Sequence, residues 1–152
     1  MKKISLLSFI WVIIDFVVKL IIHNNMNLFS SINVISGFFS LTYVRNTGAA
    51  FSILEGKRII FIIIALIAIY FIYKFLIKNN ELKKYDVFCY SLLIGGIIGN
   101  LIDRILYGYV IDYLSFNIFG YNAPIFNLAD TFIVISIILL IIKSIKEEVC
   151  KK

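Results

Sequence analysis

The feature that most constrains this chain is a set of four apolar stretches, each long enough to cross a lipid bilayer. They cover roughly residues 4–24, 58–77, 86–106 and 128–146. A helix needs about 20 apolar residues to span the hydrocarbon core. With 61% hydrophobic residues among 152, the chain has more apolar surface than a soluble domain of this size can bury. We expect one all-α membrane domain over residues 1–152, with lipid as its solvent.

Lysines gather at the ends of these stretches and predict how the chain is oriented. An even number of spans places both termini on one side of the membrane. The lysines near residues 2–3, 74–84 and 143–152 then fall together on that side. Because Lys and Arg concentrate in cytoplasmic segments, we expect both termini in the cytoplasm. The net charge of +6 is explained by this topology, and we expect no nucleic-acid partner.

The opposite side receives two longer loops, which we expect on the outer, extracytoplasmic face of the membrane. They cover residues 25–57 and 107–127, and the basic residues on this side are Arg45, Lys57 and Arg58.

These loops also show signs of regular structure. Residues 37–44 form an alternating segment rich in aromatic and β-branched residues and are followed by a turn signal at 46–48, which predicts a small extracytoplasmic β-element. The second loop is rich in aromatic residues, as expected of a segment at the level of the lipid headgroups.

Ionisable residues in the spans need a partner or a function, because each costs about 2.5–3.5 kcal/mol on insertion scales. Asp15 and Lys19 are four residues apart, so they can pair on one helix face or turn toward a substrate. Asn100, Asp103 and Arg104 share a face at the end of the third span. A structural cluster, with Asp103 paired to Arg104 or another base, and a direct chemical role are both open for these three.

The glycines before this cluster superficially resemble a phosphate-binding loop. Gly95, Gly96 and Gly99 follow no strand, however, and the spacing of Gly95 and Gly99 is that of one helix face. We interpret them as a surface for close helix packing.

Two acids have no neighbouring base in the sequence. Asp112 follows the third span, and Asp130 lies at the start of the fourth. The predicted order of the spans therefore puts both at the same membrane face. Two carboxylates in a dry site cannot both ionise cheaply, and one retains a proton. Such a pair supplies a base for water and an acid for a carbonyl, as in aspartic proteases. The alternative is that Asp130 caps the fourth helix.

The sequence offers few residues for other kinds of catalytic or metal site. His23 is the single histidine and cannot assemble a zinc site, and no Gly-x-Ser-x-Gly or HExxH pattern occurs. Cys89 and Cys150 fit no disulfide or metal spacing.

Two other classes of function remain open at this point. In a small transporter or channel subunit, buried acids and bases would line an ion path, but here most of them lie near one membrane face. A non-catalytic scaffold would not require paired acids. A transporter predicts flux without cleavage, and a protease predicts cleavage without flux.

Four sequence blocks resemble, in order and spacing, the signature blocks of bacterial lipoprotein signal peptidase (signal peptidase II), an intramembrane aspartic protease. No signature position departs from the pattern, and with the Asp15–Lys19 pair the blocks cover nearly the whole chain. The blocks are Asn46-Thr47-Gly48-Ala49-Ala50-Phe51, Gly99-Asn100-Leu101-Ile102-Asp103-Arg104, Val110-Ile111-Asp112-Tyr113 and Phe126-Asn127-Leu128-Ala129-Asp130.

The resemblance implies four transmembrane helices, a small β-sheet cradle on the outer face, and a short mobile interfacial helix in the stretch from Arg104 to Asp112 and the loop after it. It implies no metal and no cofactor. The implied catalytic pair is Asp112 and Asp130, and Asp103 would be a supporting residue. The residues implied to shape the site or hold substrate are Asp15, Lys19, Asn46, Gly96, Asn100, Arg104 and Asn127.

The implied reaction is hydrolysis of the bond N-terminal to a diacylglyceryl-modified cysteine in a prolipoprotein, which releases the signal peptide. The partners are then these substrates and membrane lipids, and we expect a monomer. The implied location is the bacterial cytoplasmic membrane, with the active site at the outer face.

Overall fold

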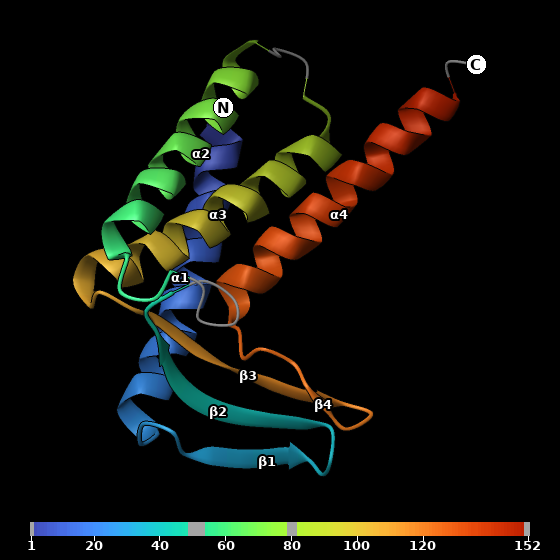
Figure 1. Ribbon diagram of the computed structural model, residues 1–152. Helices are drawn as coiled ribbons and strands as arrows, with labels where there is room; N and C mark the ends of the chain where they lie inside the picture. The colour runs from blue at the N-terminus through green and yellow to red at the C-terminus, as the bar shows by residue number, and fades with distance from the viewer. Residues whose placement is uncertain (1, 49–53, 79–81, 151–152) are drawn as a thin grey trace.

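The computed structural model describes residues 2–48, 54–78 and 82–150. Four of its helices are long and apolar enough to cross a membrane (Figure 1). They lie close to the four predicted spans, so the predicted helical membrane architecture is confirmed. Ala49, Ala50 and Phe51 of the first signature block lie outside the described residues. The helices are α1 (Lys2–Asn25), α2 (Arg58–Lys78), α3 (Lys84–Leu106) and α4 (Leu128–Val149).

Helix α3 is the centre of the bundle and packs against each of the other three helices. Its glycines allow α1 to approach closely, as the sequence predicted. An added Cβ at Gly95 would lie 2.6 Å from the Cβ of Trp11, and one at Gly99 would lie 2.6 Å from Oδ2 of Asp15. The small residues therefore set the distance between α1 and α3.

The two long loops between helices together form one antiparallel sheet. Its strand order is β1-β2-β3-β4, and Figure 1 shows it at one end of the bundle, with β1 farthest from α2, α3 and α4. The first loop contributes β1 and β2, and the second contributes β3 and β4, so the sheet is larger than the β-element predicted for the first loop alone. The strands are β1 (Ser31–Ile35), β2 (Phe39–Asn46), β3 (Val110–Ile118) and β4 (Tyr121–Asn122).

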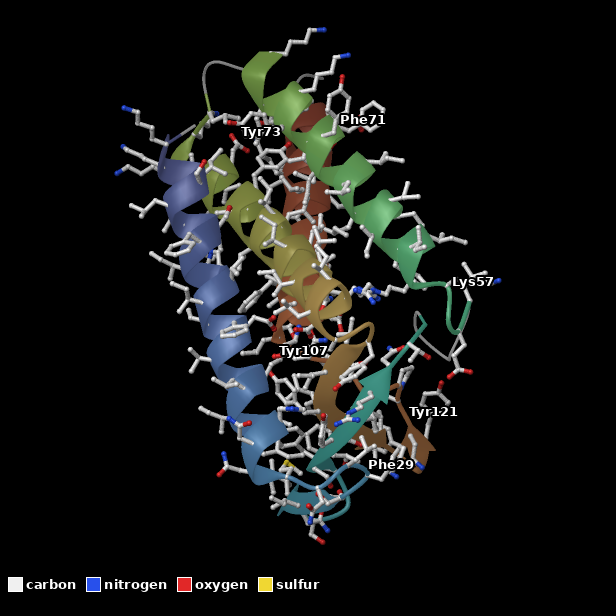
Figure 2. The ribbon with its side chains drawn as sticks, turned by 90° about the vertical axis from the view of Figure 1, so that its left-hand side faces the viewer. Phe29, Lys57, Phe71, Tyr73, Tyr107 and Tyr121 are labelled. Carbon is white, nitrogen blue, oxygen red and sulfur yellow. The ribbon has the colours of Figure 1, made fainter. Side chains whose placement is uncertain are left out.

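A small apolar core joins the sheet to the end of α1. Tyr43 of β2 and Ile111 and Tyr113 of β3 are buried against Ile22 and Met26. Figure 2 shows this end of the molecule from the side, with α1 running down to the level of the sheet. The core fixes the sheet relative to the helices.

One predicted element is corrected by the structure. The stretch from Arg104 to Asp112 was expected to belong to a short helix, but α3 ends at Leu106 and the chain enters β3 at Val110 after a turn. Gly108 in this turn has φ +83°, which ends the helical path. The β3 backbone then pairs with β2, a partner more than 60 residues away, which local sequence does not reveal.

Candidate active site

A buried ion pair on α1, between Asp15 and Lys19, supports the site. The ammonium of Lys19 lies 2.8 Å from Oδ2 of Asp15 and 3.0 Å from Oδ2 of Asp103. It also donates a hydrogen bond of 3.0 Å to Oδ1 of Asn100. All four residues are buried. Asp15 and Lys19 do pair, and the partner of Asp103 is Lys19 rather than Arg104.

Each carboxylate bound to Lys19 also holds one backbone amide. Oδ1 of Asp15 accepts from the amide of Ala129 at 2.9 Å, and Oδ2 of Asp103 accepts from the amide of Ile111 at 3.1 Å. Ala129 immediately precedes Asp130, and Ile111 immediately precedes Asp112. The ion cluster therefore fixes the backbone beside both acids of the predicted pair.

Two asparagine amides connect this cluster to the acids. Oδ1 of Asn100 accepts from Lys19 at 3.0 Å and from Nδ2 of Asn127 at 3.2 Å. With its oxygen committed, Asn100 turns its Nδ2 to Oδ1 of Asp130, at 2.7 Å. Nδ2 of Asn127 also donates to Oδ1 of Asp112 at 2.6 Å. A single ammonium thus orients an amide network that reaches both carboxylates.

Asp130 is held by the first turn of α4. Oδ1 of Asn127 accepts from the amide of Asp130 at 3.0 Å, and Oδ2 of Asp130 accepts from the amide of Asn127 at 3.3 Å. This is a capping box. The capping role that the sequence left open therefore exists, and the same carboxylate faces the site.

Asp112 lies on β3, in register with Val44 of β2. Its Oδ2 accepts from Nδ2 of Asn46 at 2.9 Å, and the amide of Gly48 holds the other end of Asn46 with a 2.9 Å bond to Oδ1. The Asp112 side chain is buried. Burial and the nearby Asp130 carboxylate raise the pKa of Asp112 from 3.8 to about 7, against the opposing hydrogen bonds of the amides.

Both acids open into one cavity of about 370 Å³. It lies between the sheet-side ends of α2, α3 and α4 and strand β3, and it mixes polar and apolar walls. A second cavity, of about 400 Å³ between α1, α2 and α3, contains no carboxylate. The polar cavity is lined by Asn46, Phe61, Asn100, Arg104, Val110, Asp112, Pro124, Ile125, Phe126 and Asp130.

Arg104 brings a positive charge to the wall of this cavity. Its guanidinium donates to the backbone oxygens of Gly48, at 3.2 Å, and Asn100, at 3.3 Å. It also lies 4.8 Å from the ring centroid of Phe61. Phe61 was not predicted as a site residue, and its place near a span end was the only sequence signal.

Gly96, which the resemblance implies in shaping the site, lies on α3 where a side chain would not fit. A Cβ there would lie 2.4 Å from the backbone oxygen of Ala129. The glycine therefore lets α3 approach the start of α4, directly beside Asp130.

Two further sequence features can be placed. His23 lies outside the cavity, with Nδ1 2.7 Å from the Tyr43 hydroxyl. Within residues 2–48, 54–78 and 82–150, no three His, Cys, Asp or Glu side chains form a group that could hold a metal ion.

Comparison with known proteins identifies a family for the whole chain. A family model described as signal peptidase (SPase) II matches residues 7–146. The chain belongs to the signal peptidase II family.

Relatives of the signal peptidase II family are similar to this chain over most of its length. The lipoprotein signal peptidases of Staphylococcus aureus strains JH9 and Newman are each 44% identical over 141 residues, which is 93% of this chain and 86% of theirs. A solved structure described as a bacterial membrane enzyme at 2.3 Å resolution has a TM-score of 0.92 and 41% identity, covering 100% of this chain and 93% of its own. A second, at 1.9 Å, has a TM-score of 0.86 and 41% identity, covering 96% and 94%.

Membership of the signal peptidase II family gives the function of this chain. The family's known function is removal of the signal peptide from prolipoproteins, and its class is the aspartic type. This protein is therefore an aspartic protease of lipoprotein processing, embedded in a bacterial membrane by four helices.

Proposed function

We propose that Asp112 and Asp130 are the catalytic pair. The observation that carries this assignment is that both carboxylates line one cavity and are joined through Asn127, which donates to Asp112 and accepts from the amide of Asp130 in the first turn of α4. The two other acids nearby, Asp15 and Asp103, are committed to Lys19. They are therefore positioning residues in this proposal.

The pair works by sharing one proton. Burial, and after it the charge of the nearby Asp130 carboxylate, raises the pKa of Asp112, so the two carboxylates resist double ionisation. The ionised carboxyl removes a proton from water, which attacks the scissile carbonyl carbon, and the protonated carboxyl donates a hydrogen bond to the carbonyl oxygen. Collapse of the tetrahedral intermediate then breaks the C–N bond, and the leaving amine takes up a proton from the pair.

The amides and the arginine around the pair are suited to hold the substrate. Asn46, Asn100, Arg104 and Asn127 surround the carboxylates, so they can bind the substrate backbone or stabilise the charge that develops on the carbonyl oxygen. The scissile bond is then the one N-terminal to a diacylglyceryl-modified cysteine. A cavity at the ends of the spans suits this bond, because the cleavage region of a signal peptide lies at the membrane interface.

We also propose that the sheet and the cavity face the outside of the bacterial cytoplasmic membrane and that both termini face the cytoplasm. The distribution of lysines supports this orientation. The enzyme then acts as a monomer formed by one domain, whose partners are diacylglyceryl-prolipoproteins and lipid.

A gel-shift cleavage assay of the purified protein in detergent or lipid tests the assignment. The substrate is a prolipoprotein with or without its diacylglyceryl group. Wild-type protein should cleave the lipidated form alone, and Asp112→Asn and Asp130→Asn should each abolish cleavage while the protein stays folded. Asp86→Asn is the matched control. Asp86 is also a buried acid with a basic partner, Lys143 of α4, but it lies at the end of α3 far from the cavity. Appreciable turnover by either active-site variant would overturn the assignment.

A further inference from the structure

The part of the sheet from Tyr113 onward lacks the charges that a water-exposed sheet normally carries. Residues 113–129, which include β4 and most of β3, contain no Asp, Glu, Lys or Arg. Several of their large apolar side chains are nevertheless exposed. An exposed, uncharged apolar surface marks a contact with a partner or with lipid.

The turn between β3 and β4 is the extreme case. Phe119 and Gly120 form a two-residue turn, closed by the pairing of Ile118 with Tyr121, and both turn residues have positive φ, +52° and +87°. Asn and Gly are the usual residues in such turns, because a bulky side chain is strained at positive φ. Phe119 is nonetheless there and is fully exposed, and Ile118 and Tyr121 beside it are 48% and 59% exposed.

The position of this turn indicates what it contacts. In Figure 1 the β3–β4 turn extends sideways from the bundle, at the level of the last turns of α1 and on the side toward which α4 leans. In Figure 2 the labelled Tyr121 lies nearer to the helical bundle than Phe29, which follows the end of α1. Because α1 is one of the four membrane spans, the turn lies at the level where this span ends on the side of the sheet.

We propose that the Phe119–Gly120 turn inserts into the lipid leaflet on the sheet side of the membrane and anchors β3 there. The partner is the phospholipid of the bilayer that the helices already span, since the turn lies at the level where α1 ends and its exposed side chains are apolar and uncharged. An aromatic ring at the interface gains by burial among the lipid chains. Asp112 lies on the same strand, so the anchor sets the depth of this carboxyl relative to the bilayer. That last consequence alone rests on the proposed catalytic role of Asp112.

Fluorescence quenching tests the insertion without reference to cleavage. The protein contains one tryptophan, Trp11, so Phe119→Trp in a Trp11→Phe background places a single reporter on the turn. Ser36→Trp in the same background is the matched control, because Ser36 lies in the turn between β1 and β2, the strands farther from the bundle. Each variant is reconstituted in phosphatidylcholine vesicles with brominated acyl chains or in unbrominated vesicles with acrylamide in the water.

The tryptophan at position 119 should be quenched at least about twofold more by brominated lipid than the one at position 36, and less by acrylamide. Tyr121→Trp, with an unstrained backbone, repeats the measurement if Phe119→Trp does not fold. Quenching by acrylamide without quenching by lipid would place the turn in water and overturn the proposal. Protection from both quenchers would also overturn it, because it would assign the turn to a protein partner.

Discussion

Replacing Asp112 by Asn should change the stability of the protein in a way that depends on pH. The pKa of this buried carboxyl is raised from 3.8 to about 7, so the folded state binds its proton more tightly than the unfolded state does. The stability of the wild-type protein therefore falls as pH rises through this interval and is level above about 7. Asn has no proton to lose, so the variant lacks this contribution.

The size of the effect follows from the pKa of Asp112. Each pKa unit corresponds to about 1.36 kcal/mol, so the ionised carboxyl costs the folded state roughly 4 kcal/mol at high pH. Between about pH 5 and about pH 8, Asp112→Asn should become more stable relative to wild type by roughly 2–3 kcal/mol. Both carboxylate oxygens accept from amides, of Asn46 and Asn127. The variant turns an NH₂ group toward one of these donors, which costs about 1–3 kcal/mol at every pH.

A buried thiol provides the assay. Cys89 is fully buried and Cys150 is exposed, so in a Cys150→Ser background a maleimide dye reports unfolding as Cys89 becomes accessible. Melting curves of the two proteins are compared at each pH, so that the pH dependence of the dye cancels. Glu55→Gln is the control, because this carboxyl is exposed and is hydrated in both states. A stability difference between Asp112→Asn and wild type that does not change with pH would refute the reasoning.

The remaining predictions concern the ion cluster, the helix contact and the rate of cleavage. Lys19→Met should lower the free energy of unfolding by about 3–5 kcal/mol in the same assay, because it leaves buried carboxylates without a counter-charge. The same change at exposed Lys74 should cost under about 0.5 kcal/mol, and equal losses would contradict this view. Gly96→Ala should cost about 1–3 kcal/mol by melting and reduce cleavage, because its Cβ would lie 2.4 Å from the Ala129 oxygen; an unchanged melting temperature would argue against a tight contact. Cleavage should decline as pH rises through about 7, where Asp112 loses its proton; a rate that stays constant across this range would exclude a shared proton.

The helical architecture could be predicted because the signal is local. Any segment of sufficient length and hydropathy is driven into lipid and must satisfy its own backbone hydrogen bonds, so α1, α2, α3 and α4 begin and end close to the predicted positions. The close packing at Gly95 and Gly99 was also predictable, because the helical spacing of small residues is likewise a local signal. The strand β3 was not, since its pairing with β2 depends on a segment far away in the chain.

The sequence named residues that the structure brings together, but it did not reveal the contacts between them. The resemblance singled out Asp112 and Asp130, and the structure places both in one cavity. The sequence left the partner of Asp103 open, and the structure identifies it as Lys19 of another helix. The sequence also set capping against catalysis at Asp130, whereas the folded chain allows its carboxylate to cap α4 and to face the cavity.

The sequence by itself determined the solvent, the number of spans and the family, because hydropathy and motif spacing belong to the chain and need no partner. Only the tertiary structure decided which charges meet. The ammonium of Lys19 reaches acids from two helices, and through Asn100 and Asn127 it is linked to both carboxylates of the proposed pair. In a bilayer a buried charge is stable only beside its counter-charge and its hydrogen-bond donors, and the packing of α1, α3 and α4 brings these groups together.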